Sequence, residues 1–335
     1  MVDVLGHLRD ASPREFGRLT EYVILEISPA LAEAQGRRAA EAGLADKVRV
    51  VNESALEVQE KISHSRNCFL IALEVLDNLP HDKVVFNPED RWAWQAEVMP
   101  ADHPVLPGYR DFPQARRSPP GTPARPPSHK ELFYGVEDPL IHKCMDFLVE
   151  AQEAWDHKHA PRPSPMWGFD SWLASHETML RPRPGGAHPA SLAVWGKSGV
   201  VYLPTGQLKL LRAIQKFAPR AQCIFADFDV LPGPVMPGAN GPSVRSVVAG
   251  EAVDHWDYLD PEFGTADVMF PTDFYALRYC FNKMFGRPTA LESTAGFMRR
   301  FPEVVAGTTA RDGTWLMEVD FLNTSMLVAE VRDCE

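Results

Sequence analysis

Long hydrophobic runs and a surplus of positive charge are both missing from this sequence. No stretch of 18 apolar residues occurs among the 335 residues, so the sequence predicts no transmembrane helix. The formal net charge is -11 at pH 7, which disfavours nonspecific binding to nucleic acid or to an anionic membrane. The same acidity favours a basic partner, such as an arginine-rich substrate.

Cysteine is scarce, and the cysteines follow no metal-binding pattern. There are five, with no CxxC pair and no grouping with histidine at zinc-ligand spacing, so the sequence predicts no metal site. Cys68 and Cys223 each begin an apolar strand, where a free thiol packs as a small hydrophobic group, and we expect a reducing compartment. The N-terminal segment carries Asp3 and Asp10 and is neither a signal peptide nor an arginine-rich transit peptide.

A glycine-rich turn between a strand and a helix is also absent. Nucleotide-binding α/β folds carry such a turn after their first strand. Here the chain opens with a helical pattern over residues 1–10 that has no N-cap, and the glycine-rich stretch at 233–241 does not lie between a strand and a helix. The absence counts against a dinucleotide-dependent oxidoreductase, and it leads us to expect that an upstream element is missing.

Strand and helix patterns alternate over the first 80 residues. The helix predicted over Ala30–Ala42 has Ser28 as its N-cap and Pro29 in its first turn. A further short helix is expected to reach about Lys61. This β-α-β-α-β order predicts a parallel, doubly wound sheet of the α/β class. Its strands are three short apolar runs, at Tyr22–Ile27, Lys47–Val51 and Cys68–Leu73.

The pattern changes after His81. A hairpin is predicted around the N-P-E-D turn signal, and Pro100–Pro127 holds nine prolines in 28 residues, which is typical of a loop or insertion. A helix is expected over Val136–Lys158, before a second Pro-rich stretch. Order then returns at 193–203. Further elements are predicted after it: strands at 222–227, 244–249 and 266–270, and helices at 207–217 and from 274 to about 285.

Acidic residues follow two of the early strands and are candidates for binding a nucleoside. Glu26 ends one strand, where a carboxylate can accept hydrogen bonds from both hydroxyls of a ribose. The alternative is a structural acid that the dipole of the following helix stabilises. Glu53 and Ser54 follow the next strand, where an adenine would lie, although acidic loop residues are commonly just solvated.

The end of the strand at Cys68–Leu73 carries the strongest candidate site. Glu74 and Asp77 lie three residues apart, where open α/β sheets place their ligands. A carboxylate pair there could bind a guanidinium, act as a base or neutralise a sulfonium; the alternative is a pair of local caps. His81 is either a general base or a turn residue. Asp227 and Asp273, at later strand ends, are secondary candidates.

Two segments give the sequence a family resemblance. E-V-L-D-N-L-P-H-D-K at 74–83 and I-L-E-I-S-P-A-L at 24–31 resemble motifs of the MidA-like S-adenosylmethionine-dependent methyltransferases, with Leu73 in place of a usual polar residue. The later segments at 202–211, 226–232 and 267–274 are also similar, so the resemblance covers nearly the whole chain outside 100–190.

The resemblance implies a class I methyltransferase fold with S-adenosylmethionine as cofactor. It implies a core formed by residues 1–99 and 191–335, with 100–190 as a Pro-rich insertion. It also implies a mitochondrial matrix enzyme that dimethylates an arginine of a respiratory complex I core subunit symmetrically and so supports complex I assembly. The residues carried over are Glu26, Glu53, Ser54 and Glu74 for the cofactor, and Glu74, Asp77 and His81 for catalysis.

One departure from the family concerns the start of the chain. The family's glycine motif and central first strand should precede Met1–Leu8, and this sequence does not contain them. We therefore expect a chain truncated at its N-terminus that binds S-adenosylmethionine poorly or not at all. The alternative is a non-catalytic assembly scaffold that keeps the methyltransferase fold without cofactor binding. An upstream reading frame that encodes a strand and a GxGxG turn would favour the enzyme over the scaffold.

Overall fold

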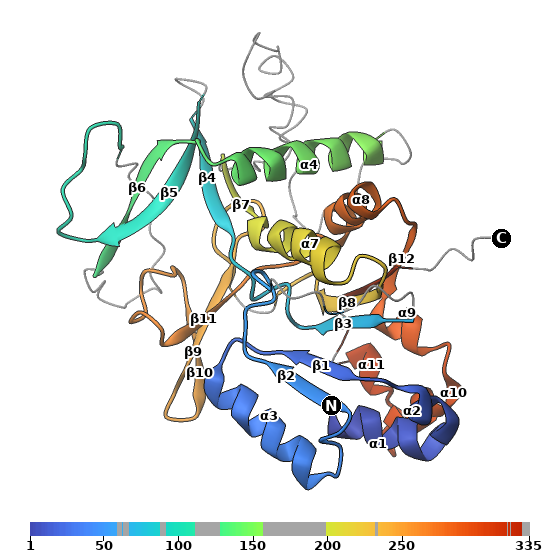
Figure 1. The fold of residues 1–335 in the computed structure, drawn as a ribbon. Helices are drawn as coiled ribbons and strands as arrows, with labels where there is room; N and C mark the ends of the chain where they lie inside the picture. The colour runs from blue at the N-terminus through green and yellow to red at the C-terminus, as the bar shows by residue number, and fades with distance from the viewer. Residues whose placement is uncertain are drawn as a thin grey trace. The chain divides into compact units, whose positions relative to one another are not determined.

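The computed structural model divides the chain into two compact units (Figure 1). The first comprises Met1–Cys68 and Lys209–Ala221, and the second comprises Phe69–Leu208 and Gln222–Glu335. The structure describes residues 1–58, 62, 67–87, 92–110, 128–156, 199–231, 234–319, 321 and 323–329. Residues 111–127 and 157–198 lie outside the described residues, and they include most of the first predicted Pro-rich stretch and all of the second.

The first unit is built on two parallel strands. β1 (Tyr22–Leu25) pairs in parallel with β2 (Val48–Val51), and α3 (Pro29–Glu41) connects them. The Ser28 hydroxyl accepts a hydrogen bond from the Leu31 N–H at 3.4 Å, so the predicted N-cap is confirmed. Two further helices precede the strands, α1 (Val2–Ala11) and α2 (Pro13–Arg18).

The short helix expected to reach Lys61 is not found in its described part. Residues 55–57 form a turn instead, in which the Ser54 carbonyl accepts from the Glu57 N–H at 2.9 Å. The Ser54 hydroxyl accepts from the Leu56 N–H at 3.3 Å. Serine favours this turn because its side chain competes for nearby backbone donors.

A four-stranded sheet with the order β12-β13-β8-β3 organises the second unit. β3 (Phe69–Leu73) pairs in parallel with β8 (Gln222–Phe228), and Ile71 lies opposite Ile224. Along β8, alternate residues are buried, including Cys223 as predicted. The remaining strands are antiparallel: β13 (Thr324–Ala329) pairs with β8, and β12 (Thr289–Ser293) pairs with β13.

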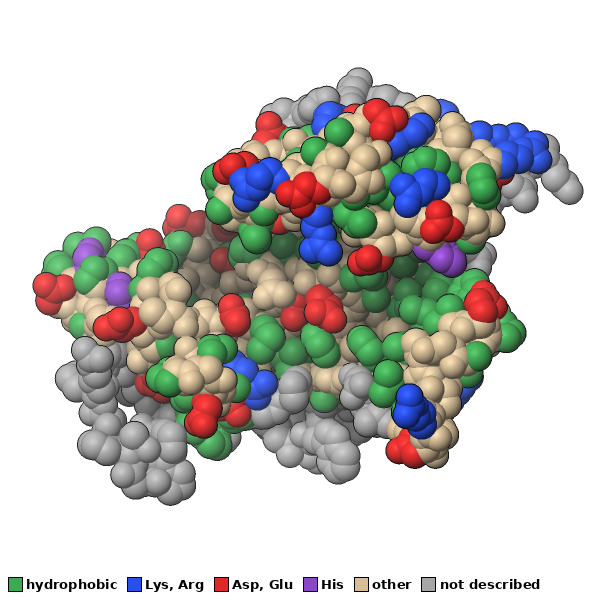
Figure 2. Space-filling model, turned by 90° about the horizontal axis from the view of Figure 1, so that it is seen from below, with side chains coloured by type: hydrophobic (Ala, Val, Ile, Leu, Met, Phe, Trp, Pro, Cys, Tyr) green, Lys and Arg blue, Asp and Glu red, His purple; other side chains and the backbone are tan. Residues whose placement is uncertain are grey.

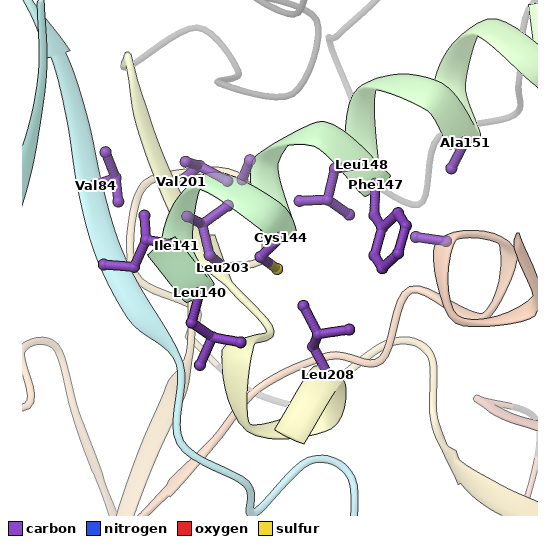
Figure 3. Close-up of a cluster of buried hydrophobic side chains, with 12 residues drawn as sticks. Val84, Leu140, Ile141, Cys144, Phe147, Leu148, Ala151, Val201, Leu203 and Leu208 are labelled. Atoms are coloured by element: carbon purple, nitrogen blue, oxygen red, sulfur yellow. The ribbon is translucent and has the colours of Figure 1, made fainter. Parts of the chain in front are cut away.

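An antiparallel sheet with the order β6-β5-β4-β7 contains the predicted hairpin. Helix α4 (Pro139–Asp156) packs against this sheet. It confirms most of the helix predicted over Val136–Lys158. In Figure 3, Ile141 of α4 lies beside Val84 of the sheet, and Cys144 and Leu148 of the same helix belong to the same buried cluster. The strands are β4 (Asp82–Asn87), β5 (Trp92–Pro100), β6 (His129–Gly135) and β7 (Val200–Leu203).

A third sheet has the order β10-β9-β11 and is wholly antiparallel. Its central hairpin turns at Ala249 and Gly250, whose φ angles of 52° and 87° match a tight primed turn. The predicted strand at 244–249 is confirmed as β9 (Ser243–Val248), and that at 266–270 as β11 (Ala266–Met269). The other strand is β10 (Glu251–His255).

Helices complete the second unit. The first four residues of α7 (Thr205–Phe217) belong to this second unit, and the remainder of the helix belongs to the first unit. α8 (Phe274–Phe285) begins at Asp273, whose carboxylate accepts from the backbone N–H of Tyr275 and Ala276. Three short helices follow: α9 (Thr294–Met298), α10 (Pro302–Thr308) and α11 (Leu316–Val319).

The surface carries charged side chains of both signs. On the face shown in Figure 2, acidic and basic side chains are interspersed with hydrophobic ones, and no continuous basic patch covers it. Within the described residues, no helix is both long enough and apolar enough to cross a membrane.

Candidate active site

Glu74 marks the point where the chain leaves β3. Its φ of 52° places it in the left-handed region, which is strained for a residue with a side chain and is typical of functional sites. Its N–H donates to the Ala226 carbonyl at 2.9 Å, and its carboxylate side chain is exposed. A strained, exposed acid at the carboxyl end of a parallel strand is therefore available to bind a ligand.

Asp227, at the end of β8, fixes the backbone that follows Glu74. It is only 1% exposed. Its Oδ2 accepts from the N–H groups of Leu76 at 2.7 Å and Asp77 at 3.3 Å, and its Oδ1 accepts from the Phe228 N–H at 2.7 Å. One buried carboxylate thus satisfies three backbone donors, two of them in the loop after β3.

Asp77 lies beside Asp227 and is equally buried, at 1% exposure. Its carboxyl group is hydrogen bonded to Asp227 and accepts from the Asn78 side-chain amide at 2.6 Å. Burial raises the pKa of Asp77 to about 7, and the negative charges of Asp227 and Glu74 add to the increase. Burial also raises the pKa of Asp227, whereas its backbone donors oppose that shift. The pair therefore shares a proton near neutral pH.

Backbone contacts hold the remainder of this loop. The Asp77 carbonyl accepts from the Phe270 N–H at 2.8 Å, and the Pro80 carbonyl accepts from the Gly206 N–H at 2.8 Å. The Thr205 hydroxyl donates to the carboxylate of Asp82. We define residues 74–81 as the Glu74 loop; β8, the start of α7 and the segment before Thr272 all contact it.

His81 closes the Glu74 loop. Its Nδ1 lies 2.9 Å from the Leu79 carbonyl, an acceptor, so the ring carries its proton on Nδ1. The ring stacks on Phe270 with centroids 3.9 Å apart and planes 10° apart. Nε2 is buried and has no hydrogen-bond partner among the described residues. Burial lowers the pKa of His81 to about 4, so the imidazole is neutral at physiological pH.

The depressed pKa of His81 predicts a stability change in acid. The unfolded chain binds a proton near pH 6.5 and the folded chain only near pH 4, so stability is lost as pH falls between these values. His81→Phe keeps the stacking and removes this titration. We expect the variant to gain about 3 kcal/mol relative to wild type from pH 7 to pH 4, measured by urea unfolding.

Comparing the variant with wild type at each pH separates the contribution of His81 to the pH dependence of stability from that of Asp77. The raised pKa of Asp77 acts in the opposite direction, because the folded chain keeps a proton that the unfolded chain releases as pH rises above about 4. A difference between His81→Phe and wild type that does not vary with pH would contradict the assignment.

In the first unit, Glu26 follows β1 with its carboxylate already oriented. Oε1 accepts from the Ser28 N–H at 2.9 Å and Oε2 from the Gln35 side-chain amide at 3.1 Å. Each oxygen keeps further acceptor capacity, and Gln35 Oε1 is a buried acceptor with no partner among the described residues. A ribose diol offers two O–H donors, so these acceptors fit the ribose of a nucleoside cofactor.

The other predicted residues divide between exposed and structural positions. Glu53 is exposed after β2, and Ser54 stabilises the turn already described. The side-chain amide of Asn52, which the sequence did not single out, donates to the Glu26 carbonyl at 2.7 Å. Asp273 is the N-cap of α8, a structural role. No group of three or more potential metal ligands occurs in the described part of the chain.

Comparison with protein families identifies the chemistry. Residues 1–290 match the family described as "Putative S-adenosyl-L-methionine-dependent methyltransferase". The chain belongs to this methyltransferase family. Its cofactor is accordingly S-adenosylmethionine, as expected from the sequence. No curated protein sequence matches the chain.

A solved structure of related shape confirms the methyltransferase-like α/β fold. The crystal structure of a Burkholderia thailandensis protein bound to S-adenosyl-homocysteine gives a TM-score of 0.51 at 16% identity, covering 98% of this chain and 68% of that one. A native crystal structure of an uncharacterised protein, also from Burkholderia thailandensis, has a TM-score of 0.47 at 15% identity and covers 93% of this chain and 66% of that one. The chain thus spans about two thirds of each neighbour's length.

Proposed function

We propose that this methyltransferase modifies arginine in a protein substrate, giving symmetric dimethylarginine. We further propose that the substrate is a core subunit of respiratory complex I and that the enzyme supports assembly of that complex in the mitochondrial matrix. Family membership supports the methyl donor. The motif resemblance at 74–83 and 24–31 supports the acceptor and the setting. The observation that carries the proposal is the exposed, strained Glu74 at the end of β3.

The chemistry at Glu74 is recognition and orientation. S-adenosylmethionine supplies an electrophilic methyl group when it is bound. The Glu74 carboxylate is planar and accepts two parallel N–H bonds from a guanidinium, which fixes the position of the attacking nitrogen. Because its negative charge attracts the positive charge of the guanidinium, it also localises charge on the substrate. Neutral His81, at the end of the same loop, does not repel the guanidinium as an imidazolium cation would.

Glu74 is also one of the residues proposed for the cofactor, and the other three would contact its nucleoside part. Glu26 would accept the ribose hydroxyls, and Gln35 holds its carboxylate in place. Glu53 and Ser54 would face the adenine.

A peptide panel tests the choice of acceptor. Three otherwise identical peptides carry arginine, lysine or citrulline at one position, and S-adenosylmethionine with a labelled methyl group is supplied at millimolar concentration. We expect label only in the arginine peptide, because only a guanidinium is both charged and bidentate towards Glu74. Equal labelling of the lysine or citrulline peptide would overturn the proposal.

The scaffold alternative predicts a different outcome of the same experiments. If the protein binds the complex I subunit but labels no peptide at any cofactor concentration, the scaffold function replaces the enzyme function.

A further inference from the structure

We infer that Asp227 is a positioning residue for Glu74: from the end of β8 it sets the backbone of the Glu74 loop and so aims the Glu74 carboxylate at the methyl acceptor. The inference rests on the proposed function, in which Glu74 contacts the acceptor. We call the hydrogen bonds between Asp227 and the Glu74 loop the clamp. The inference assigns Asp77 to this clamp instead of to guanidinium binding.

The contacts of Asp227 concentrate on the residues after Glu74. Its Oδ2 accepts from Leu76 at 2.7 Å and Asp77 at 3.3 Å, while the Glu74 N–H is held by Ala226, the residue before Asp227, at 2.9 Å. The end of β8 therefore fixes the backbone on both sides of the Glu74 side chain. A left-handed residue keeps its strained backbone only where the surroundings determine it, and these bonds do so.

The clamp requires a carboxylate at position 227. Both of its oxygens accept backbone N–H groups, Oδ1 from Phe228 and Oδ2 from the Glu74 loop. Asparagine would place an NH2 group against one of these donors, so Asp227→Asn replaces an attraction by a repulsion.

Position 77 has the opposite requirement. Its Oδ1 accepts from Asn78 at 2.6 Å, and its carboxyl group is hydrogen bonded to Asp227, which is already an acceptor. A neutral group with one acceptor and one donor is therefore needed, and asparagine supplies both with the same shape. Asp77→Asn should keep the clamp, although it removes any carboxylate that could bind a guanidinium.

Kinetics of methyl transfer to the arginine peptide test the inference. We expect Asp77→Asn to stay within about threefold of wild type, since it keeps the hydrogen bonds. Asp227→Asn should lose about 100-fold in kcat, because a small displacement of a catalytic group costs that much. A loss of about 100-fold in Asp77→Asn would overturn the assignment of Asp77 to the clamp, and this test stands even if Asp227→Asn does not fold. An Asp227→Asn variant that folds and keeps the wild-type kcat would overturn the role of Asp227.

A double variant separates positioning from general structural damage. If Asp227 acts through Glu74, then Glu74→Gln combined with Asp227→Asn should be no slower than Glu74→Gln alone. Losses that multiply would contradict the inference.

Hydrogen exchange tests the clamp without any methyl transfer. The amides of Leu76 and Asp77 should exchange slowly in wild type and Asp77→Asn and quickly in Asp227→Asn. If this pattern appears while wild type methylates no arginine, then the proposed function fails and the clamp stands. Equal exchange in all three proteins would overturn the clamp itself.

Discussion

Replacing Glu74 by glutamine should reduce methyl transfer to an arginine peptide by at least about 100-fold, because the charge that orients the guanidinium is removed while the shape is kept. The more severe Glu74→Ala should abolish transfer. Neither change should alter the melting temperature much, because the side chain is exposed. Initial rates at saturating S-adenosylmethionine, together with thermal unfolding, measure both effects.

A matched control is available in the same unit. Glu262 is also an exposed glutamate, in the loop before β11, and Glu262→Gln should leave the transfer rate within about twofold of wild type. Retained activity in Glu74→Gln would remove the Glu74 loop from the mechanism.

Replacing Gly206 by alanine should destabilise the protein by about 2–3 kcal/mol. A Cβ at Gly206 would lie 2.6 Å from the Pro80 carbonyl oxygen and 2.9 Å from the Pro80 nitrogen. These are backbone atoms, and the same carbonyl accepts from the Gly206 N–H at 2.8 Å, so neither side can retreat without breaking that bond. Urea unfolding should show the loss of stability, and the transfer rate should fall with it because Pro80 belongs to the Glu74 loop.

Gly36 provides the opposite case. It lies exposed inside α3, and a Cβ there would meet nothing within 4 Å. Gly36→Ala should therefore stabilise the protein by about 0.5–1 kcal/mol, because alanine removes the conformational entropy cost that glycine has inside a helix. If the two variants changed stability by similar amounts, the close approach at Gly206 would not be the cause.

Local features of the fold were predictable from the sequence because they depend on local chemistry. The Ser28 cap followed by Pro29 gave the start of α3, and the short apolar run before Glu74 gave β3. The hairpin of β4 and β5 followed from its turn signal. The site residue Glu74 was found in this way, from its place directly after an apolar strand. The strand was expected to be buried, which is wrong for most of its length, because Phe69, Ile71 and Leu73 are exposed.

The interactions that shape the site are long-range and could not be predicted in the same way. Asp227 contacts Leu76 across 151 positions of the sequence, and it was only a secondary candidate because an acid at a strand end has many possible roles. Nothing in the sequence around Gly206 showed that the Pro80 backbone packs against it. Such contacts depend on which strands become neighbours, and β3 pairs with β8 from the other half of the chain.

The turn at 55–57 shows a different limit. A helix was expected there, but Ser54 hydrogen bonds its own neighbouring backbone and stabilises a turn. Short segments have little intrinsic helix stability, so one competing side-chain bond changes the outcome.

The identity of the methylated residue tests the central claim most directly. The protein is incubated with a complex I core subunit and methyl-labelled S-adenosylmethionine at millimolar concentration, and the labelled product is hydrolysed to amino acids. The account predicts label in symmetric dimethylarginine with wild type and none with Glu74→Gln. Label in any other amino acid, or equal label with both proteins, would contradict it.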